Sequence, residues 1–103
     1  MALDLTCTHT DKQTTINVIG EVDVSNADLL RGALDEAFGS NAEVVRVDLS
    51  SASYIDSTGI GVLVGAAHRA ADANRAFAVL NPQRNVARVL AMLGVDGELG
   101  VGA

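Results

Sequence analysis

A chain of 103 residues can bury one hydrophobic core but not two, so we expect a single domain over residues 1–103. Hydrophobic residues make up 49% of the chain and there is one proline, which excludes an intrinsically disordered protein. The formal net charge is −6 and aromatic residues account for only 3%, so we expect no direct binding to nucleic acid or to an anionic membrane.

The acidic charge is concentrated in the first half of the chain. Residues 1–56 contain ten acidic and three basic side chains, whereas residues 57–103 contain three acidic and four basic ones. Such a surface suits a basic protein partner, although a net charge of this size is equally what ordinary solubility requires.

Cysteine and histidine are scarce. Cys7 is the only cysteine, so no internal disulfide can form, and we expect it to be a small core residue. Because His9 and His68 are the only histidines, we expect no metal site and no cofactor.

No basic region precedes an apolar run at the N-terminus, and no apolar run is long enough to cross a membrane, so the sequence predicts a soluble cytoplasmic protein.

Hydrophobic periodicity predicts two strands and then a helix. Residues 3–7 alternate apolar and polar, and residues 14–20 are rich in β-branched side chains, so the short polar link between them predicts an antiparallel hairpin. Apolar residues recur at helical spacing over 25–38. Ser25 is the expected N-cap, with Asp28 in a short-armed variant of the capping box, and the following glycine suits the end of the helix.

Two further strand–helix units follow. Residues 44–49 are rich in valine, which favours an inner strand, and residues 50–55 are expected to form a loop before a helix that begins near Ser57. A strand at 77–80 precedes a helix capped by Asn81, with the chain's one proline at its first position. The expected buried faces of these two helices are Ile60, Leu63, Val64, Ala67 and Ala71, and then Val86, Val89, Leu90 and Leu93.

This order of elements predicts an α/β fold. Right-handed crossovers make the later strands parallel to one another, beside the antiparallel opening hairpin. The expected architecture is a mixed, mostly parallel sheet of four or five strands, packed against three or more helices. A fifth strand would lie in residues 95–101.

The most informative stretch is Tyr54-Ile55-Asp56-Ser57-Thr58-Gly59-Ile60-Gly61. Its hydroxyl pair, Ser57 and Thr58, stands where a helix begins, and the unpaired N–H groups and the dipole of a helix N-terminus favour a phosphate or carboxylate. Taken alone, the pattern is also explained by capping, because a serine or aspartate here can satisfy an amide of the first turn. We expect Asp56 both to cap the helix and to take part in binding.

The sequence supports an enzymatic function of this stretch less well than a binding function. Ser57 lacks the G-x-S-x-G context of a hydrolase nucleophile, and only two histidines are available as a base. The glycines at 59, 61 and 65 miss the dinucleotide-binding spacing by one residue. Three glycines in one helix instead indicate close packing or close approach by a partner. A catalytic serine therefore ranks last among the hypotheses, and we expect no enzyme.

Residues 45–50, Val-Arg-Val-Asp-Leu-Ser, followed by residues 54–63, Tyr-Ile-Asp-Ser-Thr-Gly-Ile-Gly-Val-Leu, resemble the STAS family. This domain is shared by bacterial anti-sigma factor antagonists and sulfate transporter tails. The resemblance covers nearly the whole chain, with a second, weaker match at Gly20-Glu21-Val22-Asp23. It implies a STAS fold for this sequence.

The resemblance also implies a function in transcription regulation by partner switching. In the family, the serine directly after the Asp is phosphorylated by a kinase that is also the anti-sigma factor, so the implied phosphorylation site is Ser57. Unphosphorylated antagonist binds the kinase and releases its sigma factor, the phosphoprotein does not bind, and a phosphatase resets the cycle. Acidic positions that match Asp23 and Asp56 help in kinase recognition. The expected partner-binding residues are Asp23, Asp56, Ser57, Thr58, Gly59, Ile60 and Gly61.

An alternative keeps the fold and changes the regulation. STAS domains also serve as constitutive protein-docking modules of transporters or signalling assemblies, without phosphorylation. The sequence leaves both functions open, and it leaves the oligomeric state open as well.

Overall fold

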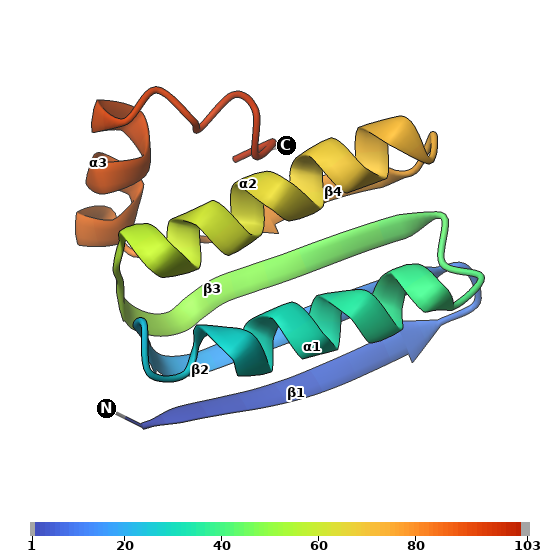
Figure 1. Ribbon diagram of the computed structural model, residues 1–103, viewed down its shortest axis with the longest axis horizontal. Coiled ribbons are helices and arrows are strands. Elements are labelled where there is room, and N and C mark those ends of the chain that lie inside the picture. Colours follow the sequence, from blue (N-terminus) through green and yellow to red (C-terminus); the bar gives the residue numbers. More distant parts are fainter. Residues whose placement is uncertain (1, 102–103) are drawn as a thin grey trace.

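The computed structural model describes residues 2–101 and contains one four-stranded sheet in the order β1-β2-β3-β4 (Figure 1). The strands are β1 (Leu3–Thr10), β2 (Gln13–Val22), β3 (Val44–Ile55) and β4 (Ala76–Leu80). β1 pairs with β2 antiparallel, whereas β2, β3 and β4 are parallel to one another. The predicted mixed, mostly parallel sheet with an antiparallel opening hairpin is confirmed.

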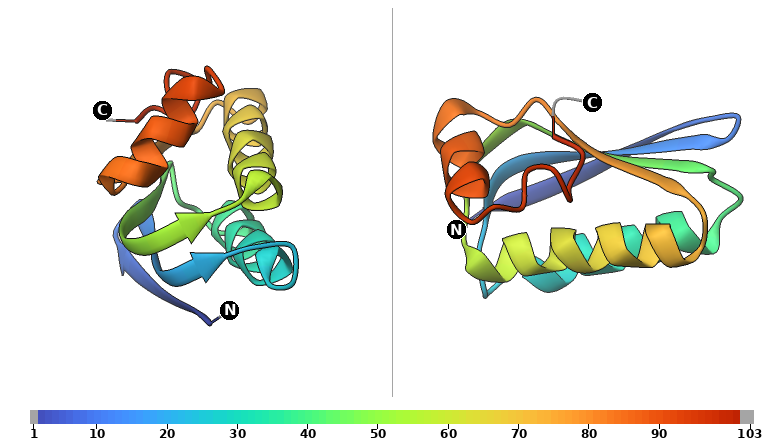
Figure 2. Two further views of the ribbon diagram at one scale, coloured as in Figure 1. Left: turned by 90° about the vertical axis from the view of Figure 1, so that its left-hand side faces the viewer. Right: turned by 90° about the horizontal axis from the view of Figure 1, so that it is seen from above.

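The described residues also contain three helices: α1 (Ala27–Gly39), α2 (Ser57–Asp72) and α3 (Arg84–Met92). α1 and α2 lie side by side on one face of the sheet, and α3 lies at the end of the molecule where β3 finishes (Figures 1 and 2). The α2 N-terminus and the β2–α1 connection lie at that same end (Figure 1).

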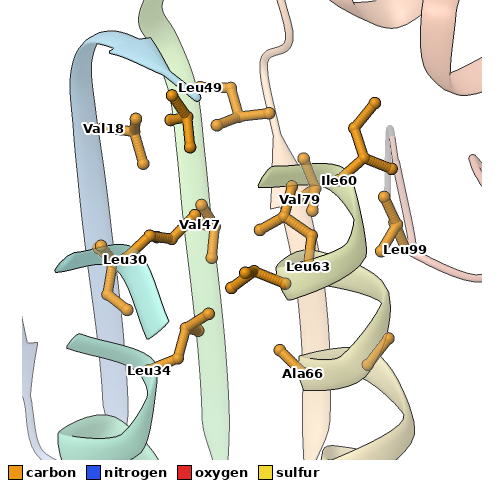
Figure 3. Packing of buried hydrophobic residues seen from close by; sticks show 14 of the residues in the cluster. Val18, Leu30, Leu34, Val47, Leu49, Ile60, Leu63, Ala66, Val79 and Leu99 are labelled. Carbon is orange, nitrogen blue, oxygen red and sulfur yellow. The ribbon is translucent and has the colours of Figure 1, made fainter. Parts of the chain in front are cut away.

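The core fills the layer between the sheet and the helix pair. Alternate residues of the inner strands, such as Val18 and Val47, face Leu30 of α1 and Leu63 of α2 (Figure 3). Each such side chain contributes about 1.5–3 kcal/mol when it is removed from water. The largest fully buried side chains are Ile16, Leu30, Leu49, Leu63, Leu90, Leu99, Val18, Val22, Val45, Val47, Val79 and Val86.

The loop predicted at 50–55 is wrong, because β3 continues to Ile55. β2 has ten residues against the twelve of β3, and it pairs with β3 as far as Ile55 through two register shifts, between Asn17/Ile19 and Gly20/Glu21. These irregularities break the alternation of side chains, so Ala52 and Ile55 are both buried although they are three positions apart. A strand whose buried and exposed side chains do not alternate cannot be recognised as a strand from the sequence.

The N-cap of α1 lies one residue later than predicted. Its N-cap is Asn26, and the Ser25 hydroxyl instead donates to the Asp23 carboxylate. The predicted capping box does not form, since Asp28 makes an ion pair with Arg31. Local hydrogen bonds within the β2–α1 connection therefore compete successfully with the cap that the sequence pattern favours.

α3 also begins later than predicted, with Gln83 as its N-cap in place of Asn81. Asn81 has a φ of 54°, so the chain turns through the left-handed region before the helix starts. The Gln83 side-chain amide then donates to the Ser50 carbonyl, 3.0 Å away, and this contact holds the start of α3 beside β3.

Several expectations about burial are wrong. Val89 and Leu93 are exposed, because the short α3 contacts the molecule only along Val86 and Leu90. Ala71 is exposed, because the core-facing side of α2 continues from Leu63 through alanines at 66, 67 and 70. Cys7 is exposed as well, because β1 is an edge strand that α1 covers only in part.

Residues 95–101 contain turns and do not form the predicted fifth strand. Leu99 is nevertheless completely buried, and it lies near Ile60 and Val79 (Figure 3). Its carbonyl accepts a hydrogen bond from the Val79 N–H, 3.0 Å away. This segment therefore covers the free edge of β4 without becoming a strand.

Candidate partner-binding site at the start of α2

Asp56 joins three parts of the chain where α2 begins. Its Oδ1 accepts from the Gly59 N–H at 3.0 Å, which caps the first turn of the helix. Its Oδ2 accepts from the Val24 N–H at 3.2 Å, and its own N–H donates to the Val22 carbonyl at 3.0 Å. One carboxylate thus fixes the β2–α1 connection against the α2 N-terminus.

Asp23 is held inside a compact turn in that connection. Its carboxylate accepts from both the N–H and the hydroxyl of Ser25, and its N–H donates to the side-chain oxygen of Asn26. The Ser25 hydroxyl is the main reason that the pKa of the Asp23 carboxyl lies below its ordinary value. Asp23 is therefore ionised at neutral pH and lies in the segment bonded to Asp56.

Ser57 is the first residue of α2, and it is exposed. The Asp56 side chain and carbonyl accept from the N–H groups of Gly59 and Ile60. Within residues 2–101, the N–H groups of Ser57 and Thr58 have no hydrogen-bond acceptor. Those two donors and the positive end of the helix dipole are suited to stabilise an anion attached at this position.

The predicted binding residues divide into an exposed and a buried group. Ser57 and Gly61 are exposed and Thr58 is partly exposed, whereas Gly59 and Ile60 are buried. A Cβ on Gly59 would lie 2.7 Å from side-chain carbons of both Val22 and Ile55, so this glycine serves the packing of the helix on the sheet. The stretch thus combines a packing function with a surface function.

Two neighbours of the site were missed in the sequence. Val24 lies next to Asp23 with 76% of its surface exposed, and its N–H is the donor to Asp56. Asn26 is a buried amide whose nitrogen donates to the Glu21 carbonyl, so it orders the turn that carries Asp23. A polar residue directly before an apolar helix is a signal for Asn26, but no sequence signal indicated that Val24 would be exposed.

Exposed apolar side chains occur around this end of the molecule. Tyr54 precedes the site on β3 with 43% of its surface exposed, and Leu29 in the first turns of α1 is 58% exposed. α3 lies at the same end (Figure 1), and Met92 in its last turn and Leu93 directly after it are exposed. Apolar surface beside an acidic turn is typical of a protein-binding surface.

A shallow groove of about 230 Å³ runs between α1 and α2. Gly61 and Gly65 line one side, and Arg31 and Asp35 line the other. Neither glycine has a neighbouring atom within 4 Å of an added Cβ, so intramolecular packing does not require them. An ion pair between Arg69 and Asp35 connects the two helices along the groove.

Other kinds of site find no support in the described part of the chain. No group of histidine, cysteine and acidic side chains in residues 2–101 is arranged to hold a metal ion. Over the same residues, no helix is both long and apolar enough to span a membrane.

A sequence model described as "Mlab, STAS domain" matches residues 5–101. The chain belongs to the STAS domain family. The match includes every helix and strand described above except the first two residues of β1. The family expected from the Asp-Ser-Thr-Gly signature is thereby confirmed.

Proteins named as anti-sigma factor antagonists are similar to this chain. The anti-sigma-B factor antagonist of Listeria monocytogenes is 45% identical over 51 residues, which make up 50% of this chain and 45% of that protein. An anti-sigma factor antagonist from Mycobacterium paratuberculosis superposes with a TM-score of 0.89 at 19% identity, covering 97% of this chain and 85% of the other. The sequence alignment therefore spans less than half the length of the Listeria relative. The superposition on the mycobacterial protein covers nearly the whole of this chain.

SpoIIAA, an anti-sigma factor antagonist from Bacillus, has been solved in unphosphorylated and phosphorylated forms. The unphosphorylated form superposes with a TM-score of 0.80 at 21% identity, covering 99% of this chain and 89% of SpoIIAA. At this identity the likeness demonstrates a common fold.

Proposed function

We propose that this STAS domain is an anti-sigma factor antagonist that switches partners through phosphorylation of Ser57. The unphosphorylated protein binds an anti-sigma factor that is also a serine kinase, and the bound sigma factor is released. Phosphorylation of Ser57 blocks that binding, and a phosphatase restores it. The domain, residues 1–103, acts in the cytoplasm by binding, without catalysis of its own.

The observation that carries the proposal is the position of Ser57. It is an exposed hydroxyl at the first position of α2, directly after the aspartate that caps the helix. A kinase can reach this hydroxyl without unfolding the helix. The similarity to curated anti-sigma-B factor antagonists supports the same function.

A phosphate at Ser57 would act on the partner more than on the domain. It adds a charge of about −1.5 to −2 and three acceptor oxygens, which the free N–H groups and the helix dipole can stabilise. A partner that packs on this turn would meet extra bulk beside the carboxylates of Asp23 and Asp56, and it would have to desolvate the phosphate. The switch therefore needs no refolding, because the phosphate obstructs the interface directly.

The test compares Ser57→Ala with Ser57→Asp by direct titration of the purified partner kinase. We expect Ser57→Ala to bind like the unmodified protein and Ser57→Asp to bind at least about tenfold more weakly, a difference of roughly 1.4 kcal/mol. Asn41→Asp is the matched control, because it adds one charge in the exposed α1–β3 connection at the opposite end of the sheet. Equal affinities for the two Ser57 variants would refute the proposal.

A constitutive docking module is the second candidate. The observation that favours it is the exposed apolar surface of Val24, whose N–H bonds to Asp56, and of Tyr54, two residues before Asp56, which can bind a partner whatever the state of Ser57. In that case both Ser57 variants bind alike, and mass spectrometry of protein from its native cells finds no phosphate on the peptide that contains Ser57.

A further inference from the structure

The two edges of the sheet differ. The β4 edge is covered by residues 95–101, through the hydrogen bond from the Val79 N–H to the Leu99 carbonyl. The β1 edge is open, since no recorded backbone hydrogen bond within residues 2–101 reaches its outer side. β1 is eight residues long and has neither a proline nor a register shift. Natural proteins usually protect an edge strand of this kind.

The register of the hairpin determines which backbone groups are free. Thr10 and Gln13 flank a two-residue turn, and the Ala2 carbonyl accepts from the Glu21 N–H, so even-numbered residues of β1 bond to β2. The outward N–H and C=O groups consequently belong to the odd-numbered residues Leu3, Leu5, Cys7 and His9. Their side chains lie on the face that carries the helices, because Leu5 pairs with the buried Val18.

The apolar layer above this edge is incomplete. Leu3 and Leu5 are only half-buried. Glu36 of α1 lies close enough to Cys7 to raise the pKa of its thiol, after the larger effect of partial burial. Leu29 is seven residues before Glu36, on the same side of α1, and is 58% exposed. The core thus continues to the β1 edge and ends there without a cover.

We propose that β1 pairs antiparallel with β1 of a second copy of this chain. A two-fold axis normal to the sheet would relate the two copies and place both helix layers on the same face of the joined sheet. Because facing side chains of paired strands lie on the same face, each facing pair must be both odd-numbered or both even-numbered. With Thr6 facing Thr6, Leu3 faces His9 and Leu5 faces Cys7, and the free N–H and C=O groups of all four odd residues are satisfied. The four-stranded sheets of the two copies would then form one continuous sheet.

The charge of the β1 edge allows a second copy as the occupant. Copies with a net charge of −6 repel each other over most of their surface. Asp4 is the only acidic residue of β1, and its side chain lies on the face away from the helices. β1 itself therefore adds little repulsion between two paired copies, and Glu36 of α1 is the acidic side chain closest to Cys7 that would weaken the pairing.

The helices are placed to support this pairing. α1 contacts both β1 and β2. Because strands are about 4.8 Å apart, two α1 helices related by the axis would lie about 10 Å from each other, the upper end of normal helix packing.

Disulfide trapping tests the pairing and its register, in a Cys7→Ser background. Facing Thr6 residues form a non-hydrogen-bonded pair with Cα atoms about 4.5 Å apart, within the range of a disulfide. Thr6→Cys is therefore expected to cross-link at least tenfold faster than Thr8→Cys, whose exposed side chain lies on the same face but opposite Asp4. Equal rates, or no cross-link in either folded variant, would overturn the proposal.

Sedimentation of the unmodified chain across a dilution series provides an independent readout. We expect a concentration-dependent dimer that Cys7→Lys converts to monomer, because a lysine on the helix-side of an edge opposes strand pairing. Thr8→Lys adds the same charge on the other face and should leave the dimer in place. A monomer at every concentration contradicts the proposal and leaves the edge for a strand of a different protein.

Discussion

The Val24 N–H and the Asp56 carboxylate are joined by a hydrogen bond of 3.2 Å that spans 32 positions of sequence. The same carboxylate caps α2 through Gly59. The acidic turn at Asp23 and the exposed Ser57 are consequently parts of one structure. A change at Asp56 should therefore affect both the helix and the loop.

Asp56→Ala should destabilise the domain by about 1–2 kcal/mol, because the cap and the bond to Val24 are both lost. Chemical denaturation measures the free energy of unfolding. Asp72→Ala, at the last position of the same helix, is the control and should leave stability unchanged or slightly increased, since an acid there opposes the helix dipole. Equal losses in the two variants would contradict the capping role.

Gly59→Ala and Gly61→Ala should change stability in opposite directions. An added Cβ at 59 collides with Val22 and Ile55 at 2.7 Å, and such overpacking typically costs about 1–3 kcal/mol. At 61 the Cβ meets nothing within 4 Å, so alanine should stabilise the helix by up to about 1 kcal/mol. Thermal unfolding of both variants is the measurement, and a stabilised Gly59→Ala would show that this packing is misassigned.

Gly61→Ala also tests the binding surface. Because the substitution should not weaken the fold, a lower affinity for the partner kinase would place position 61 at the interface. We expect a loss of several-fold in affinity, measured by titration against the unmodified domain. Unchanged affinity would confine the interface to the first turn of α2.

Leu99→Ala should be strongly destabilising although it lies outside all helices and strands. Leu99 is completely buried near Ile60 and Val79, and large-to-small changes at such sites cost about 2–5 kcal/mol. Met92→Ala, at a side chain that is 79% exposed, is the matched control and should change stability by less than about 0.5 kcal/mol. Similar effects from both would mean that residues 95–101 do not close the core.

Ser25→Ala should raise the pKa of Asp23. The Ser25 hydroxyl stabilises the charged carboxylate, so the folded-state pKa is below the unfolded one. The resulting stabilisation is present above the unfolded pKa and is lost as the pH falls through the folded value. An NMR titration of the carboxyl carbon should show the shift in Ser25→Ala and not in Ser51→Ala. An unchanged titration in Ser25→Ala would exclude this hydrogen bond as the cause.

The sequence by itself determined the order of elements, the hairpin and the parallel crossovers, and the motif at the start of α2. Each of these rests on local patterns: alternation in β1, β-branched content in β2, valine content in β3, and the Asp-Ser-Thr-Gly turn before an apolar helix. Such patterns extend over short stretches of the chain, so they can be recognised from the sequence alone.

Only the tertiary structure decided what the ends of those elements do. β3 extends to Ile55 because β2 pairs with it through register shifts, and α1 starts after Asn26 because the Asp23 turn takes the Ser25 hydroxyl. Leu99 is buried because β4 has a free edge to cover. The extension of β3 and the burial of Leu99 depend on partners that are distant in sequence, whereas the start of α1 depends on a side-chain hydrogen bond within the β2–α1 connection. Hydrophobic periodicity records neither kind of contact.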